Sequence, residues 1–365
     1  ELTLFMFIGK NMSLGDTLNH RQWNLSLSDT NALKGIALIL LLCHHLFYIQ
    51  DGSYNDILVF GKYPLVQEFG LACKVCVAIF VFLSGYGLAM KYSHTLLNIR
   101  EFYATRFTKL MMGYWFVWLL FIPVGILFFD RTPEVVYHNH IVWKFLADFL
   151  GLAYNFGFYG FNPTWWFMSC ILVLYLLFPL LFKLCRRYWL FLLVISVGIT
   201  WIPLYVFNPI KYYLFTFLIG IICVQKGLFD RLFCMAKPVF VRNLLGGKLL
   251  IISIVLFTIR RFFPCPLFFD SILTLLFVMS YLKLTHSGKL TKWLEFLGRH
   301  SMNIFLFHTF IFLYYFHDIV YCSGNPFLIF LTLLYSCLAI SMGMEYLKKA
   351  IRFDVFCKQL IRKLK

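Results

Sequence analysis

The chain of 365 residues is 61% hydrophobic and only 13% charged, with a mean hydropathy of +0.79. Soluble domains are about half apolar and a quarter charged, so this composition excludes a water-soluble protein and predicts one that crosses a membrane several times. The net charge of +17 raises the question of nucleic-acid binding, but the cations lie in short gaps between apolar runs. That distribution excludes a nucleic-acid-binding surface and fits the positive-inside pattern of membrane proteins.

Apolar runs of membrane length recur along the chain and predict an all-α fold of about ten transmembrane helices. The runs lie at 33–50, 71–90, 110–129, 164–182, 188–207, 211–225, 249–262, 267–284, 301–318 and 327–347. The aromatic stretch 142–158 is broken by Gly and Asp, which favours an interfacial or re-entrant element over an eleventh span.

The distribution of Lys and Arg predicts the orientation. With the N-terminus inside, the cytoplasmic segments hold 25 of these residues and the outer segments about six. This bias predicts that both termini are cytoplasmic and that the number of spans is even. The chain then divides into a cytoplasmic segment (1–32), a transmembrane domain (33–347) and a basic amphipathic tail (348–365) that we expect on the anionic inner leaflet.

The first span contains Lys34 and His45, and ionisable residues inside a span usually line a cavity or a site. Eleven residues correspond to about 1100° of helix rotation and about 16 Å of rise, so the two share a face. His44 lies about 80° away from Lys34 by the same geometry. We therefore predict that His45 acts with Lys34. A snorkelling Lys34 and a histidine cap at the helix end remain open alternatives.

Three further features lie near other spans. The stretch Ser84-Gly85-Tyr86-Gly87 predicts a close helix contact or a local break. Arg106 and Lys109 are three residues apart and could hold the phosphates of a soluble ligand. His308 lies deep in the ninth span, so together with His45 it predicts a shared polar cavity.

Aromatic residues near the predicted outer face are candidates for sugar binding. Tyr159, Trp165 and Trp166 could stack on a sugar ring or belong to an interfacial aromatic belt. The histidines of the HNH stretch at 138–140 have a spacing that metal sites use, but no third ligand is in view, so we expect no metal. The cysteines lie mostly within apolar runs, where we expect them to act as small hydrophobic residues.

Several of these stretches together resemble the acyltransferase 3 family of membrane acyltransferases over about residues 30 to 350. Lys34, ten residues and His45 resemble the family's Arg-(ten residues)-His first span, with Lys in place of Arg. FVFLSGYGL resembles its second span, and RFTK at 106–109 resembles its basic Arg-x-x-Arg loop. PTWWFMSCILVLYLLFPLL resembles its Trp-led middle span, and LGRHSMNIFLFHTF resembles its late LGxxSxxIYLxH signature.

The resemblance implies an O-acetyltransferase that moves an acetyl group from cytoplasmic acetyl-CoA to a hydroxyl of a cell-envelope or exported polysaccharide, in the cytoplasmic membrane of a bacterium. With the residues above, it leads us to expect that His45 is the general base and that Lys34 holds the donor or offsets developing negative charge. We expect Arg106 and Lys109 to bind the CoA phosphates, and His308 to orient the reacting group or share the proton. An acyl-histidine relay is equally compatible with the sequence. The acceptor would be a glycan or a lipid-linked saccharide.

A different class of protein also fits part of the pattern. A proton-coupled transporter or flippase of a glycan or lipid-linked sugar would use intramembrane Lys and His without any acyl transfer. The sequence contains no detectable internal repeat, which transporters commonly have, and it carries the Arg106 and Lys109 pair. These two observations favour the acyltransferase.

Overall fold

The computed structural model describes residues 24–59, 62–93, 95–202, 208–233, 239–260, 266–284 and 288–365. The predicted segment 1–32 therefore lies mostly outside the described residues. The described chain is almost entirely helical, as the composition predicts, because helices satisfy backbone hydrogen bonds internally where no water is present.

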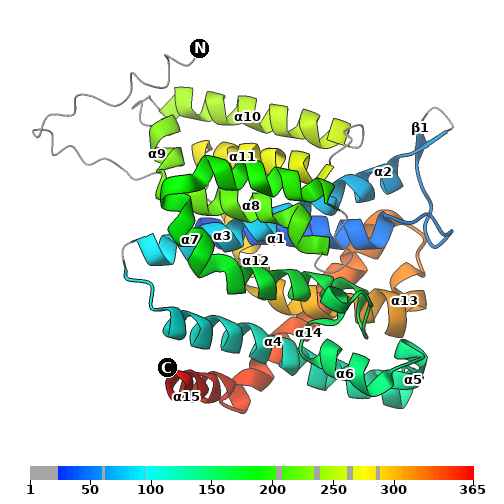
Figure 1. Cartoon of the computed structure of the whole chain (residues 1–365). Coiled ribbons are helices and arrows are strands. Elements are labelled where there is room, and N and C mark those ends of the chain that lie inside the picture. The colour runs from blue at the N-terminus through cyan, green and yellow to red at the C-terminus, as the bar shows by residue number, and fades with distance from the viewer. Residues whose placement is uncertain are drawn as a thin grey trace, which may run out of the picture.

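The long helices run side by side in one bundle (Figure 1). Their bounds are α1 Leu27–Phe47, α3 Cys76–Ser93, α4 Ile99–Phe128, α7 Trp166–Gly198, α8 Asn208–Gln225, α10 Val239–Ile259, α11 Pro266–Lys283, α12 Lys289–Thr309 and α14 Pro326–Ala350. Within the described part of the chain, five segments are long and apolar enough to cross a membrane. They are Leu27–Phe47, Leu65–Ser93, Ile99–Phe128, Pro163–Trp201 and Pro326–Ala350.

Short elements gather at the two ends of the bundle (Figure 1). At one end lie α2 Leu65–Ala72, α5 Pro133–Tyr137, α6 Ile141–Phe149, α13 His317–Tyr321 and a small hairpin of β1 Leu58–Val59 and β2 Tyr63–Pro64. At the other end lies α9 Leu228–Phe233, and the last helix, α15 Phe353–Leu364, runs back along α4 toward the same end. The residue that follows this helix, Lys365, pairs with Glu101 at 2.5 Å.

Each of the ten predicted spans overlaps a helix, with some differences in the boundaries. The spans predicted at 164–182 and 188–207 are joined in α7, which has a kink at Tyr188 in place of a loop. α4 begins at Ile99, so Arg106 and Lys109 belong to a helix that starts earlier than predicted. The stretch 142–158 forms only α6 and a short 3-10 turn, so it is not a span. The number of ten spans and the cytoplasmic position of both termini stay predictions.

Glycine lets α1 and α12 approach closely, and these two helices form the most extensive contact of the described bundle. Gly35 lies against the backbone of Leu294, and Gly298 lies against the backbone of Asn31. Because a Cβ points toward the N-terminus of its helix, this pattern sets Gly35 opposite Gly298 on parallel helices. His45 and His308 each follow ten residues after their glycine, so the same register brings the two histidines together.

The predicted contact at Ser84-Gly85-Tyr86-Gly87 is also confirmed. Gly85 of α3 lies against the backbone of Phe217 in α8, at the second most extensive helix contact. A side chain at residue 85 would hold these helices apart.

Candidate active site

Three histidines form a row between α1 and α12. The ring centroids of His45 and His308 are 5.0 Å apart, and those of His44 and His45 are 5.1 Å apart. His308 is fully buried, and its Nδ1 lies 3.0 Å from the carbonyl oxygens of Ile304 and Phe305. Since carbonyl oxygens only accept, Nδ1 carries the proton, which leaves Nε2 of His308 as a base or acceptor.

The helix changes its hydrogen bonding directly after His308. Residues Phe310–Tyr315 form a π-helix, a rare element that is frequent at functional sites. One turn before Phe310, the carbonyl of Leu306 accepts hydrogen bonds from Trp165 Nε1 at 2.9 Å and from Asn162 Nδ2 at 3.2 Å. The segment that precedes α7 is thus fastened to the helix turn that carries His308.

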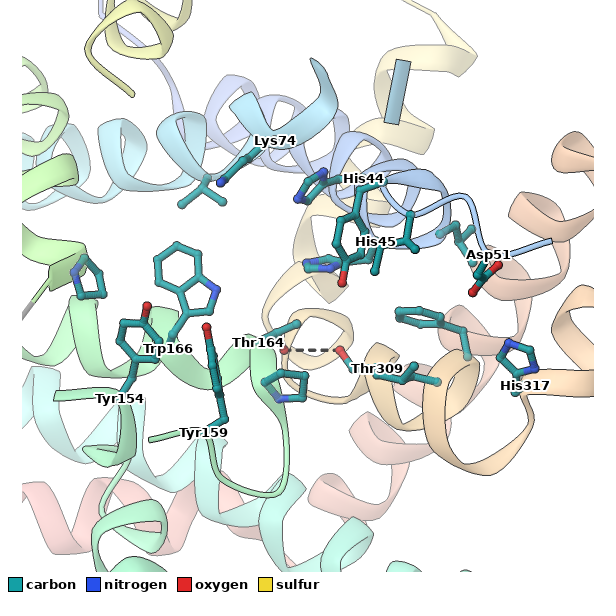
Figure 2. Close-up of a pocket in the computed structure, with 18 of the residues that line it drawn as sticks. His44, His45, Asp51, Lys74, Tyr154, Tyr159, Thr164, Trp166, Thr309 and His317 are labelled. Carbon is teal, nitrogen blue, oxygen red and sulfur yellow. Dashed lines mark hydrogen bonds between the residues drawn. The ribbon is translucent and has the colours of Figure 1, made fainter. Parts of the chain in front are cut away.

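A cavity of about 540 Å³ opens beside this row, and we call it the histidine cavity. Figure 2 shows His44 and His45 on one side, Trp166, Tyr154 and Tyr159 on another, and Lys74 near His44. His44 donates its Nδ1 proton to the carbonyl of Gly70 at 2.8 Å, which leaves its other nitrogen as an acceptor. The cavity therefore combines aromatic walls with histidine bases, a combination that suits a hydroxylated ligand.

A second cavity of about 480 Å³, which we call the arginine cavity, is lined by Lys34 and Arg106. Ser84 and Tyr175 also line it and share a hydrogen bond of 2.9 Å between their hydroxyls. Nε of Arg106 is buried and has no hydrogen-bond partner within the described residues. Lys34 and Arg106 give this cavity a positively charged lining, which suits an anionic ligand.

The same helices line both cavities, one on each side of the histidine pair. On α1, the arginine cavity is lined as far as Lys34 and the histidine cavity begins at His44. On α12, the arginine cavity is lined as far as Phe305 and the histidine cavity begins at Thr309. On both helices the arginine cavity thus lies toward the N-terminal end and the histidine cavity toward the C-terminal end, where His45 lines the cavity and contacts the buried His308.

A comparison with protein-family models decides the family. The model described as an acyltransferase domain matches residues 28–346, which is most of the chain. The chain belongs to the acyltransferase 3 family. It is accordingly a membrane acyltransferase in general terms. Searches of curated proteins and of solved structures each gave no match.

Some of the predicted site residues of this acyltransferase line a cavity, whereas their predicted partners do not. Arg106 lines the arginine cavity, whereas Lys109 is exposed and does not line it. Trp166 and Tyr159 line the histidine cavity, whereas Trp165 is buried behind its wall. Trp165 holds the wall in place through its bond to α12 and does not contact the cavity space.

Sequence reasoning missed several residues that line the two cavities of the acyltransferase. His44 and Lys74 line the histidine cavity, and Ser84 and Tyr175 line the arginine cavity. A signal was available for Lys74, because it is a cation within a predicted span. Tyr175 gave no signal, since it is one aromatic residue among many in an apolar helix.

Asp148 holds the segment that carries the aromatic wall of the acyltransferase. Its carboxylate accepts hydrogen bonds from Tyr137 Oη and from the backbone N–H of Phe161, each at 2.8 Å. Tyr114 Oη donates to its backbone carbonyl at 2.6 Å. Asp148 lies in α6, outside the candidate spans, and burial raises the pKa of its carboxyl to about 6. This carboxyl fixes residues 151–165 and with them Tyr159.

Proposed function

We propose that the protein is an O-acetyltransferase that moves an acetyl group from acetyl-CoA to a hydroxyl of a cell-envelope or exported polysaccharide. The observation that supports this proposal best is the presence of two cavities along α1 and α12 with the His45–His308 contact at one of them, since one cavity can hold the donor and the other the acceptor. In this proposal the enzyme works in the cytoplasmic membrane of a bacterium, with its donor cavity toward the cytoplasm.

The arginine cavity is the proposed site of acetyl-CoA. Lys34 and Arg106 supply two positive charges, and phosphates are favoured ligands of such groups. The hydroxyls of Ser84 and Tyr175 lie further along the same cavity and offer partners for the amides of the pantetheine arm. The thioester would then lie near the histidine pair.

The chemical step uses His45 as the general base. Its ring takes the proton of the acceptor hydroxyl while that oxygen attacks the thioester carbonyl. The C–S bond then breaks, and the leaving CoA thiolate takes the proton back from His45. His308 contacts His45 and orients it, because two backbone carbonyls fix the His308 tautomer.

A relay through an acyl-histidine is the second route that this geometry supports. In that route the His45 ring attacks the thioester, CoA leaves, and the acceptor hydroxyl later attacks the acyl-imidazole. The two routes differ in one measurable respect. The relay leaves label on the protein when labelled acetyl-CoA is supplied without acceptor.

The test is transfer of radiolabelled acetyl from acetyl-CoA to envelope glycans in membranes carrying the wild type, His45→Ala or His138→Asn at matched expression. His138 is an exposed histidine that lines neither cavity, so it serves as the control. We expect label in glycan for the wild type and the control, and loss of at least 100-fold for His45→Ala. Equal labelling of all three membranes contradicts the role of His45. Failure of the wild type both to bind acetyl-CoA and to label glycan contradicts the transferase and favours transport.

A further inference from the structure

Lys74 lies in the short turn that joins α2 to α3. The helical segment Leu65–Ser93 is interrupted by a 3-10 turn at Cys73–Val75. The neighbours of Lys74 in this turn, Cys73 and Val75, are buried, whereas the Lys74 side chain is exposed and lines the histidine cavity. Figure 2 shows Lys74 close to His44.

Lys74 has no close ion-pair partner in the part of the chain that the structure describes. Among these described residues, none forms a side-chain hydrogen bond with Lys74 either. The carboxylate of Asp270 is held by Arg260, whose Nη2 lies 2.6 Å from Oδ2 while its Nε bonds Oδ1. Arg260 also donates to the carbonyl of Leu71 at 3.2 Å, three residues before Lys74. The acidic group of this region is thus already paired.

The acidic residue that lines the cavity, Asp51, lies far from Lys74. Figure 2 shows Asp51 beside His317, on the opposite side of His45. Its carboxylate accepts a hydrogen bond from the backbone N–H of Ser53 at 2.9 Å. The cavity therefore has a cationic end at Lys74 and an anionic end at Asp51, with the histidine row between them.

An unpaired lysine within an apolar segment is expensive unless it meets an anion or faces water in a site. We infer that the acceptor carries a carboxylate or phosphate group, which binds Lys74 while its hydroxyl lies at His45. This inference rests on the proposed function, because it names the class of acceptor for the same cavity. The acceptor is thus an acidic or phosphorylated saccharide.

The rest of the cavity fits such a ligand. Trp166, Tyr154 and Tyr159 line the cavity across from His45 in Figure 2, where their rings can stack on the apolar faces of a sugar. A cavity of about 540 Å³ falls in the size range of small-molecule sites. Lysine suits either anion here, since it acts as a point charge and does not require the planar geometry that arginine prefers.

The experiment compares the binding of three matched glycosides to the purified full chain in detergent. The probes are methyl glucoside, methyl glucuronide and methyl glucoside 6-phosphate, which share a ring and differ in charge. Apparent Kd is measured from the dependence of Tm on ligand concentration. The proteins are the wild type, Lys74→Gln, Lys74→Arg and Lys91→Gln. Lys91 is an exposed lysine of α3 that does not line the histidine cavity.

We expect the wild type to bind at least one anionic glycoside about tenfold more tightly than the neutral one, which is the effect of one charge-assisted contact. The preference should disappear in Lys74→Gln and persist in Lys74→Arg and Lys91→Gln. The two anionic probes separate a carboxylate from a phosphate as the group that is bound. Equal binding of all three probes, no binding of any, or a preference that survives in Lys74→Gln overturns the inference.

This measurement is independent of catalysis. If the charge preference is found but no acetyl transfer occurs, the proposed function fails and the ligand class of the cavity stands. If transfer occurs without any charge preference, the proposed function stands and the role of Lys74 is overturned.

Discussion

Replacement of Gly298 by alanine tests whether the close contact of α1 and α12 creates the active site. An added Cβ would clash with the carbonyl oxygen of Asn31 and lie 2.7 Å from the carbonyl carbon behind it, whereas ordinary contacts of this kind measure 3.4–4 Å. The helices must therefore separate by more than about 1 Å, and a misplacement of about 1 Å near reacting groups can already cost about 100-fold in rate. Overpacking of this kind costs about 1–3 kcal/mol in stability, so most of the protein should still fold.

The assay is acetyl transfer at saturating acetyl-CoA, together with Tm in detergent, for the wild type, Gly298→Ala and Gly343→Ala. Gly343 lies in α14 with no atom within 4 Å of its added Cβ, so it carries the same substitution without the clash. We expect kcat to fall about 100-fold for Gly298→Ala and to stay near the wild-type value for Gly343→Ala. If folded Gly298→Ala has the activity of Gly343→Ala, the glycine contact does not set the distance between His45 and His308.

Three further predictions concern the two cavities and their support. Arg106→Gln should raise the KM for acetyl-CoA about tenfold and Lys109→Gln should leave it unchanged, as steady-state kinetics will show. Trp166→Ala should raise the KM for the acceptor about tenfold without changing that for acetyl-CoA. The pKa of the Asp148 carboxyl is about 6 in the folded protein against an ordinary value of 3.8. The protonated carboxyl therefore contributes about 3 kcal/mol to the free energy of unfolding below pH 4, and this contribution is lost as the pH rises through 6. Over that range the Tm of the wild type should fall relative to Asp148→Asn, and parallel Tm curves would contradict this.

The helical fold and the histidine pair could be predicted from the sequence because a membrane restricts both the backbone structure and the places where ionisable residues can lie. Apolar runs in lipid must form helices, and an ionisable residue within one needs a cavity or a partner. The pairing of His45 with His308 followed from there being two deep histidines in different spans. Their ring centroids lie 5.0 Å apart because Gly35 and Gly298 set the register of α1 against α12. The sequence of either helix by itself does not reveal that register.

The orientation of neighbouring residues could not be predicted, because helix rotation is set by packing. Residues three apart differ by about 60° around a helix, which is enough to put Arg106 in the cavity and Lys109 outside it. Adjacent residues differ by about 100°, so one of Trp165 and Trp166 had to turn away from the acceptor. The bond from Trp165 to Leu306 decides which one, and it joins residues that are 141 positions apart.

The position of the histidine pair explains why this fold suits transfer between two sides of a membrane. His308 is fully buried and contacts His45, which lines the histidine cavity. Exclusion of water protects a thioester from hydrolysis and strengthens the electrostatic contacts of the transition state. In the proposed reaction neither CoA nor a saccharide has to cross the bilayer, since only the acetyl group is transferred.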